Sequence, residues 1–397
     1  MISVETAFKR IVDPAKPLAT ERLALAKCSG RVLSGPIGAR RSQPGSDVSA
    51  MDGYAVKSTD LSGKDVSFKQ IGESAAGAPF TGTVKSGETV RIFTGASMPK
   101  GADQVVIQEN AGPVDGGIFT NESPAPEKNI RLMGYDFLEK QIVLEGGTFL
   151  TPKSLGIAAS SGHSHLMVHR PPKIALLATG DELVSPDAKK FSTHETVNST
   201  VPQLSAMITD IGGTVVDVGH AGDDLASLKR AIKDANDADI LVTIGGASVG
   251  DRDFMQQALA EEGMKLDFWK VAMKPGKPLI FGRKDGQYIL GLPGNPVSAF
   301  VCAMIYLRPL IDKLMGRPAP LPTGIPLPTA TALKANGPRQ DFMRARLIGR
   351  QGERHVDAAV SQDSGQLSVL AQSDGLIIRP PDAPAAEAGE LVPFLPF

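Results

Sequence analysis

Two different hydrophobic patterns divide the chain. From residue 42 to about residue 145, short apolar segments are separated by Gly, Pro and Asn, which is typical of β-rich regions. From Lys173, apolar runs of strand length such as KIALLAT and DILVTIGG alternate with segments of helical period such as DDLASLKRAIKDAN. Strands and helices that alternate in this way predict a parallel sheet covered by helices. We therefore expect a multidomain α/β protein with a doubly wound, mainly parallel sheet domain and a β-rich inserted region.

The rest of the chain predicts a further small domain. The segment GRPAPLPTGIPLPT, which begins at Gly316, contains too much proline for a helix or a central strand, so we interpret it as a linker. Beyond it, alternating segments such as DFMRARLIG predict a small C-terminal β-barrel or sandwich. The expected division is an N-terminal segment (1–41), a β-rich domain (42–145), a return segment (146–172), an α/β domain (173–314) and a C-terminal β-barrel domain (315–397).

Charge and composition exclude several classes of protein. The chain has 397 residues, and 42 Lys and Arg against 43 Asp and Glu give a net charge of −1, which does not provide the positive field of a nucleic-acid-binding protein. It has neither a signal-peptide pattern at its start nor an apolar run long enough to span a bilayer, so we expect a cytoplasmic protein without membrane partners. Cys28 and Cys302 lack the spacing of a metal or redox motif.

Unusual loops follow the predicted strands, at the edge where open α/β sheets bind ligands. In ILVTIGGASVGDRD (240–253), glycines and a serine could cradle a phosphate. Asp251 and Asp253 would repel that phosphate unless a cation such as Mg²⁺ lay between them. For this loop alone, a tight turn with helix-capping aspartates is the better-supported alternative. The carboxylates of TGDE (179–182) could likewise bind metal or ribose, or cap the next segment.

Two further loops add cationic and rigid groups. KVAMKPGKP (270–278) places three lysines on a segment stiffened by proline and glycine, which predicts an anion site or, alternatively, a solvated surface loop. In GLPGNPVS (291–298), Asn295 fits a helix N-cap and Pro296 the first helical position. Together the loops predict a site for a phosphorylated, nucleotide-bearing ligand with a divalent cation. The P-loop and dinucleotide-binding motifs are absent from the sequence.

Six motifs are spread along nearly the whole chain: SAMDGYAV (49–56), RIFTGASMP (91–99), TGDEL (179–183), TIGGASVGDRDF (243–254), KPGKP (274–278) and GLPGNPVSA (291–299). They resemble the motifs of the MoeA/gephyrin family of molybdopterin molybdenumtransferases. The resemblance implies a MogA/MoaB-like sheet domain and the last step of molybdenum cofactor synthesis. In that step, adenylylated molybdopterin and molybdate give the cofactor and AMP, with Mg²⁺ required. The resemblance further implies a homodimer whose active cleft combines the sheet domain of one subunit with the β-rich domain of the other. It also implies a MogA-type adenylyltransferase and molybdoenzyme maturation factors as partners.

The resemblance also assigns roles to individual residues. Candidate catalytic residues are Asp52, Asp223, Asp253, Lys270 and Lys274. Candidate Mg²⁺ ligands are Glu182, Asp253 and one aspartate of the Asp223/Asp224 pair, for which Asp223 is chosen. Candidate substrate-binding residues are Thr94, Arg131, Gly245, Gly246, Ser248, Gly250, Pro293, Pro296 and Ser364. Among these, Arg131 and the two lysines are expected to hold phosphate or molybdate, Ser248 and the glycines to contact phosphate, and the two prolines to shape the pterin end. We expect the lysines to be unpaired without an anion.

One motif departs from the family. Tyr135 stands where the family usually has Glu, so either position 135 is not essential or the chain is a specialised paralogue. Two other functions remain open at this point: a gephyrin-like scaffold without catalysis, and a related nucleotide phosphoanhydride hydrolase. The sequence does not distinguish molybdate from tungstate.

Overall fold

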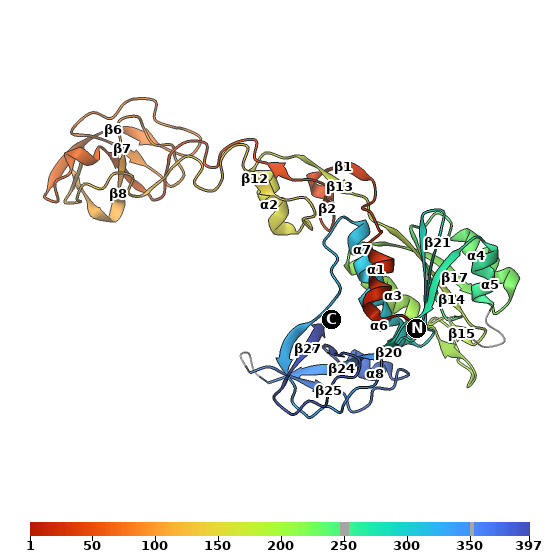
Figure 1. Ribbon diagram of the computed structural model, residues 1–397. Coiled ribbons are helices and arrows are strands. Elements are labelled where there is room, and N and C mark those ends of the chain that lie inside the picture. The colour runs from red at the N-terminus through yellow and green to blue at the C-terminus, as the bar shows by residue number, and fades with distance from the viewer. Residues whose placement is uncertain (247–253, 350–352) are drawn as a thin grey trace. The chain divides into compact units, whose positions relative to one another are not determined.

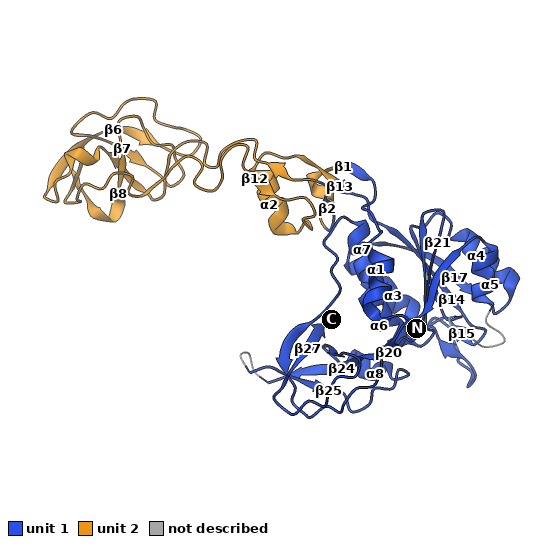
Figure 2. Cartoon of the chain, in the orientation of Figure 1, with its two compact units in different colours: residues 1–21, 30–34, 168–397 blue, residues 22–29, 35–167 orange. Residues whose placement is uncertain are grey.

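The computed structural model describes residues 1–246, 254–349 and 353–397. It divides the chain into two compact units, shown along the chain in Figure 1 and coloured separately in Figure 2. Unit 1 contains residues 1–21, 30–34 and 168–397, and unit 2 contains residues 22–29 and 35–167. The five-segment division expected from the sequence is finer than these two units, and its boundaries stay a prediction.

Unit 2 is rich in β-structure. Its main sheet has the strand order β8-β5-β7-β6-β10-β9, and buried apolar residues line both faces of β5, with Ala55 in one cluster and Val56 in another. The strands are β5 (Gly53–Val56), β6 (Val66–Ser74), β7 (Glu88–Ile92), β8 (Gln104–Ile107), β9 (Ala111–Val114) and β10 (Gly117–Thr120). The predicted β-rich character of this region is therefore confirmed.

Smaller elements complete the part of the chain before the parallel sheet. They are η1 (Leu25–Lys27), η2 (Ser58–Asp60), η3 (Gln108–Asn110) and α2 (Pro152–Ser160). Two short ribbons pair β4 (Val48–Ser49) with β11 (Ile130–Arg131) and β3 (Ile37–Gly38) with β12 (Ile142–Leu144). A three-stranded sheet has the order β1-β13-β2, with β1 (Thr20–Ala24), β13 (His165–His169) and β2 (Val32–Leu33).

Unit 1 contains the predicted doubly wound sheet, in the order β17-β14-β18-β22-β21-β19. Its first four strands are parallel, and the last two are antiparallel to their neighbours. The strands are β14 (Lys173–Thr179), β17 (Thr214–Ala221), β18 (Ile240–Ile244), β19 (Lys265–Lys270), β21 (Pro278–Lys284) and β22 (Gln287–Leu292). A separate parallel ribbon joins β15 (Leu183–Val184) to β16 (Thr196–Val197).

Helices cover both faces of this sheet (Figure 1). On one face, α4 (Leu225–Asp234) and α5 (Met255–Glu261) pack with Leu241 and Ile289 of the central strands in one buried cluster. On the other face lie α1 (Val4–Val12), α3 (Thr200–Asp210) and a long helix of residues 296–314. The long helix consists of α6 (Pro296–Cys302), a π-helical turn η4 (Ala303–Leu307) and α7 (Arg308–Leu314). The predicted helical segments are therefore confirmed.

The C-terminal part of unit 1 is a small barrel. Its strand order is β20-β24-β26-β27-β23, and β25 also pairs with β24. Thr329, directly after β23, bridges to Val356 of β25, which closes the sheet on itself around a buried apolar cluster. The elements are β20 (Met273–Lys274), β23 (Ile325–Pro328), β24 (Gln340–Ile348), β25 (His355–Ala358), α8 (Leu367–Ala371), β26 (Gly375–Arg379) and β27 (Leu391–Pro396).

Two sequence interpretations need correction. The expected linker is only partly a linker, because β23 within it pairs antiparallel with β27. Two of the prolines, Pro326 and Pro328, lie on β23, the last strand of the hydrogen-bonded strand order, where missing N–H donors are tolerated. Asn295 occupies the N-cap position of α6, but within the described residues its side chain makes no capping hydrogen bond. Pro296 removes one of the N–H groups that would otherwise need such a cap.

Candidate active site

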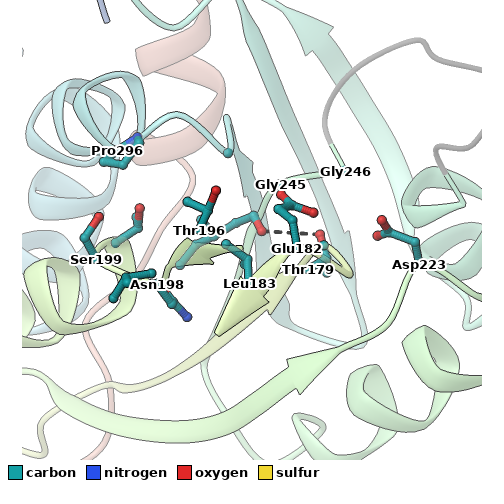
Figure 3. Close-up of a pocket in the computed structure, with 15 residues that line it drawn as sticks. Thr179, Glu182, Leu183, Thr196, Asn198, Ser199, Asp223, Gly245, Gly246 and Pro296 are labelled. Atoms are coloured by element: carbon teal, nitrogen blue, oxygen red, sulfur yellow. Dashed lines mark hydrogen bonds between the residues drawn. The ribbon is translucent and has the colours of Figure 1, made fainter. Parts of the chain in front are cut away.

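A pocket of about 340 Å³ lies at the carboxyl edge of the parallel sheet. It is formed where β14 and β18 end, between the β15-β16 ribbon and the starts of α3 and α6 (Figure 3). Its lining is Thr179, Gly180, Glu182, Leu183, Thr196, Val197, Asn198, Ser199, Thr200, Asp223, Ile244, Gly245, Gly246, Gly294 and Pro296. Three of the four loops that the sequence singled out, 179–182, 240–253 and 291–298, therefore contribute residues to one pocket.

The floor of the pocket depends on close approach of two strand ends. The hydroxyl of Thr179 donates to the carbonyl of Ile244 at 3.3 Å (Figure 3). Gly245 follows with a φ of +94°, and a Cβ atom there would lie 2.8 Å from the Thr179 hydroxyl oxygen. Only glycine fits this position, so the first glycine of the IGGAS sequence keeps the pocket open.

Two carboxylates line the pocket from different loops. Glu182 comes from the turn after β14, and Asp223 from the turn after β17. Asp224 instead caps α4, where its side chain accepts a hydrogen bond from the N–H of Ser227 at 2.9 Å. Hydrogen bonds from Ser227 lower the pKa of Asp224 below its usual value. The two members of the Asp223/Asp224 pair therefore occupy different environments, and only Asp223 lies in the pocket.

The donor set of the pocket is compatible with Mg²⁺. Both carboxylates supply the oxygen ligands that Mg²⁺ prefers, and Mg²⁺ is commonly held by one or two carboxylates together with substrate phosphates. Among the described residues, no group of three or more His, Cys, Asp or Glu side chains is placed to hold a metal ion by itself. A cation in this pocket would therefore need oxygen atoms of the ligand as well.

The opposite side of the pocket is suited to an anion. Ser199 and Thr200 stand at the start of α3, an 11-residue helix, whose first-turn N–H groups and dipole favour negative charge. Gly245 and Gly246, the predicted phosphate contacts, also line the pocket, but on the side of Glu182 and Asp223 (Figure 3). The pocket thus combines a carboxylate side with a side that attracts anions.

Some predicted site residues lie away from this pocket or cannot be placed. Ser248, Gly250 and Asp253 lie outside the described residues. Pro296 lines the pocket, whereas Pro293 is buried at the end of β22 and is not among the lining residues that the described structure defines. The predicted contact of Pro293 with the pterin stays a prediction.

The two lysines are not an unpaired cluster, which corrects the expectation from the sequence. Nζ of Lys274 lies 3.2 Å from Oδ2 of Asp341, whose side chain is only 12% exposed. Nζ of Lys270 lies 3.6 Å above the centre of the Trp269 ring, where the electron-rich face attracts a cation. The pairing of Lys274 could not be anticipated locally, because its partner comes from the barrel, 67 residues further along the chain.

Arg344 is a candidate anion ligand that the sequence analysis missed. Its side chain is fully buried, and within the described residues Nε and Nη1 have no hydrogen-bond partner. Burial lowers the pKa of Arg344, while the nearby carboxylates of Asp341 and Asp363 oppose that change. Such unsatisfied donors on a buried cation are costly unless they serve a ligand. The sequence could have indicated this role, because Arg344 lies two residues after Phe342 and therefore on the same face of β24 as that buried side chain.

Ser364 belongs to the segment that runs next to this arginine. It lies in the turn before α8, directly after Asp363. In the same segment, the carbonyl of Ser361 accepts a hydrogen bond from Nη2 of Arg344 at 3.3 Å, and Gln362 donates to the Arg344 carbonyl at 3.0 Å. The predicted serine thus lies in the segment bonded to Arg344, in the same part of the protein as Lys274.

Unit 2 contains a second group of predicted site residues. Oδ1 of Asp52 accepts hydrogen bonds from the N–H and the hydroxyl of Thr94. Arg131 is exposed on β11, opposite Val48 of β4, and Val48 also bridges to Ser97 of the loop that carries Thr94. The structure therefore brings Asp52, Thr94 and Arg131 into one region of this unit, whereas the other predicted residues that it describes belong to unit 1.

The fold and these sites define a multidomain α/β protein that handles anionic ligands. Two features indicate this class of protein. Carboxylates and glycines line a pocket at the edge of a parallel sheet, and the side chains of Lys274 and Arg344 belong to strands of the β-barrel. The sequence matches three family models: the MoeA N-terminal region (domain I and II) at residues 2–162, a probable molybdopterin binding domain at 175–313, and the MoeA C-terminal region (domain IV) at 326–397. The chain belongs to the MoeA family of molybdopterin molybdenumtransferases.

Full-length relatives carry the same name. The chain is 36% identical to a molybdopterin molybdenumtransferase of Haemophilus influenzae, covering 100% of this chain and 99% of that one. It is 34% identical to molybdopterin molybdenumtransferase 2 of Mycobacterium tuberculosis, covering 98% of each. A solved molybdopterin biosynthesis MoeA protein of Pyrococcus horikoshii superposes with a TM-score of 0.84 at 26% identity, covering 100% of this chain and 99% of the other. None of the helices in the described part of this chain is long and apolar enough to cross a membrane.

Proposed function

We propose that this protein inserts molybdate into adenylylated molybdopterin and releases AMP, the last step of molybdenum cofactor synthesis. The observation that carries the proposal is the pocket in which Glu182, Asp223 and Gly245 meet, in a chain related over its full length to proteins named for this transfer. The predicted scaffold function would not by itself require carboxylates and glycines to converge on one pocket. No observation favours the scaffold or the hydrolase alternative.

The residues of the pocket would bind and orient the phosphoanhydride. The start of α3 and the backbone of Gly245 and Gly246 would hold phosphate oxygens. Glu182 and Asp223 would hold Mg²⁺, with Asp253 as a further ligand by family resemblance. When bound, Mg²⁺ supplies neutralisation of the phosphoanhydride charge. Phosphoryl chemistry of this kind depends on positioning and charge stabilisation more than on a strong protein nucleophile.

The cations of unit 1 outside the pocket would hold the oxyanion. Lys274 forms an ion pair with Asp341, whose charge also acts on Arg344, and we propose that a tetrahedral dianion accepts hydrogen bonds from both cations. Lys270 and Ser364 are further candidates for this contact. Molybdate and tungstate carry the same charge and shape, so these groups would bind either one.

Asp52, Thr94 and Arg131 would act from a second copy of the chain. We propose a homodimer in which unit 2 of one copy serves the pocket of the other, in keeping with the family resemblance. We also propose that a MogA-type adenylyltransferase supplies the substrate and that molybdoenzyme maturation factors receive the product. A light-scattering mass near that of the single chain, 41.7 kDa, at micromolar concentration would contradict the dimer.

The decisive experiment is an assay of the purified protein with adenylylated molybdopterin, Mg²⁺ and either molybdate or tungstate. We expect AMP and cofactor to form together, only when an oxyanion and Mg²⁺ are both present. AMP release that does not depend on the oxyanion would identify a phosphoanhydride hydrolase instead. Absence of both products would leave the scaffold function as the better description.

A further inference from the structure

Two hydrogen bonds join the acidic loops of the pocket. The N–H of Asp223 donates to Oδ1 of Asp181 at 3.1 Å, which ties the loop after β17 to the loop after β14. Nε2 of His220, at the end of β17, lies 2.6 Å from the carbonyl oxygen of Gly180. Because a carbonyl only accepts, the imidazole must donate from Nε2. We call this pair of hydrogen bonds the loop clasp, and it connects the loop of Glu182 to the loop of Asp223.

A β-bulge directs His220 toward its partner. The register between β14 and β17 shifts by one residue, since Leu176 lies opposite Asp217 but Ala178 lies opposite His220. Gly219 lies within this shift with a φ of +83°, a conformation that glycine adopts without strain. Its N–H donates to Oδ1 of Asp217 at 2.8 Å. Bulges of this kind re-aim the next side chain, and here the next side chain is the imidazole.

We propose that Asp181 and His220 are positioning residues that hold Glu182 and Asp223 at the spacing a shared cation requires. The identity of that cation as Mg²⁺ rests on the proposed function. Two carboxylates that face one pocket repel each other while no cation is bound, and they stand on separate loops that could move apart. The loop clasp opposes this separation. It therefore acts on metal binding through the two carboxylates and does not itself touch the ligand.

Matched substitutions of His220 test the proposal. The amide nitrogen of glutamine can take the place of Nε2, whereas the shorter asparagine reaches only the place of Nδ1. We expect His220→Asn to raise the Mg²⁺ concentration for half-maximal turnover about threefold to tenfold, the equivalent of one lost hydrogen bond, with an unchanged kcat at saturating Mg²⁺. His220→Gln should restore the wild-type requirement. His220 is exposed, so neither substitution disturbs a buried core.

Asp181 offers an independent pair of variants. Asp181→Asn keeps a side-chain oxygen that can accept from the N–H of Asp223, whereas Asp181→Ala removes it. We expect Asp181→Ala to resemble His220→Asn and Asp181→Asn to resemble wild type. His355→Asn is the control, because that histidine lies on β25 of the barrel and its contact to the Glu353 carbonyl is made by Nδ1 at 2.9 Å, a position that asparagine can supply.

Hydrogen–deuterium exchange of the metal-free protein gives a readout that does not depend on turnover. Amides of residues 180–184 and 222–224 should exchange faster in His220→Asn and Asp181→Ala than in wild type, and at the wild-type rate in the two conservative variants. The proposal is overturned if exchange and Mg²⁺ requirement are the same in all variants, or if kcat falls while the Mg²⁺ requirement stays constant. If the wild-type protein shows no oxyanion-dependent turnover, the proposed function fails, and the exchange rates still decide whether the loop clasp holds these loops.

Discussion

Both donors of Thr94 reach the same carboxylate oxygen of Asp52, the N–H at 2.7 Å and the hydroxyl at 2.8 Å. These hydrogen bonds, the one from the N–H most strongly, lower the pKa of Asp52 below its usual value, and Arg91 contributes in the same direction. The carboxylate lies in the bend before β5. Asp52 is therefore presented at the surface of unit 2 as a fixed, ionised group.

Replacing Thr94 with valine should raise the pKa of Asp52 toward its usual value, because the hydroxyl donor is lost while the N–H remains. A depressed carboxyl pKa contributes stability above the pKa of the unfolded chain, and this contribution disappears as the pH falls through the folded pKa. Thr94→Val should therefore be less stable than wild type at neutral pH and equally stable at the acid limit. Carboxyl ¹³C titration and urea unfolding at both pH values measure the two effects; an unchanged Asp52 titration would contradict the expectation.

Asp52→Ala should abolish cofactor formation and leave the fold intact. Asp52 is half-buried in a bend and its carboxylate bonds only to Thr94 in the described structure, so the thermal midpoint should fall slightly, by a few degrees at most. Asp115→Ala is a suitable control, since Asp115 is exposed in the turn between β9 and β10 of the same unit. A midpoint lowered by many degrees would instead assign Asp52 a structural role.

Lys274→Met should destabilise the protein by about 1–2 kcal/mol, because the nearly buried carboxylate of Asp341 loses a charged partner. Lys270→Met should have a smaller effect, since Lys270 lies on the face of Trp269 and forms no ion pair with any carboxylate among the described residues. Urea denaturation of both variants tests this difference. In the turnover assay, each exchange should cost about tenfold to a hundredfold if the lysine holds an oxyanion. Less-than-additive losses in the double variant would indicate one shared anion.

Arg344→Met should abolish oxyanion binding without lowering the free energy of unfolding by more than about 1 kcal/mol. Methionine fills part of the volume and removes the buried nitrogens Nε and Nη1, which lack hydrogen-bond partners among the described residues. This gain should largely offset the lost hydrogen bond to Ser361 and the lost attraction to Asp341 and Asp363. Equilibrium dialysis with molybdate measures the binding. Arg346→Met, on an exposed position of the same strand, is the control. Full molybdate binding by Arg344→Met would exclude Arg344 as a ligand.

Tyr135→Glu should change the free energy of unfolding by no more than about 0.5 kcal/mol, because the side chain is 74% exposed and exposed substitutions have small effects. This variant introduces the residue that the family resemblance leads us to expect at position 135. Turnover within a few-fold of wild type would mean that position 135 is not essential. A large gain in turnover would mark this chain as a specialised form in which tyrosine limits the common reaction.

The sequence predicted the elements of the sheet domain well, because they depend on local patterns. The strand KIALLAT ends at Thr179 as expected, and the glycines after Ile244 meet the TGDE loop because parallel strands end at the same edge of a sheet. The capping of α4 by Asp224 could also be predicted from the sequence, since a helix cap depends on residues that are close together in the chain.

Contacts between distant segments were beyond this kind of prediction. The sequence predicted only a loop at residues 270–278, and it did not indicate that Met273 and Lys274 form a short strand that pairs with β24 of a different sheet. The buried guanidinium of Arg344 depends on the segment that includes Ser361, which folds over the strand. The orientation of His220 depends on a one-residue register shift, which no local propensity specifies.

The two-residue strand β20 has a consequence for dissecting the protein. It follows β19 of the sheet domain and is completed by backbone pairing with Gln340 and Asp341 of the barrel. A truncated chain that ends before residue 326 would retain Lys274 but lose the strand that fixes its backbone and the carboxylate that fixes its side chain. The sheet domain expressed alone is therefore an unsuitable minimal enzyme. Low activity of such a fragment would reflect the lost support of residues 270–278 and would not measure the activity that its pocket can provide.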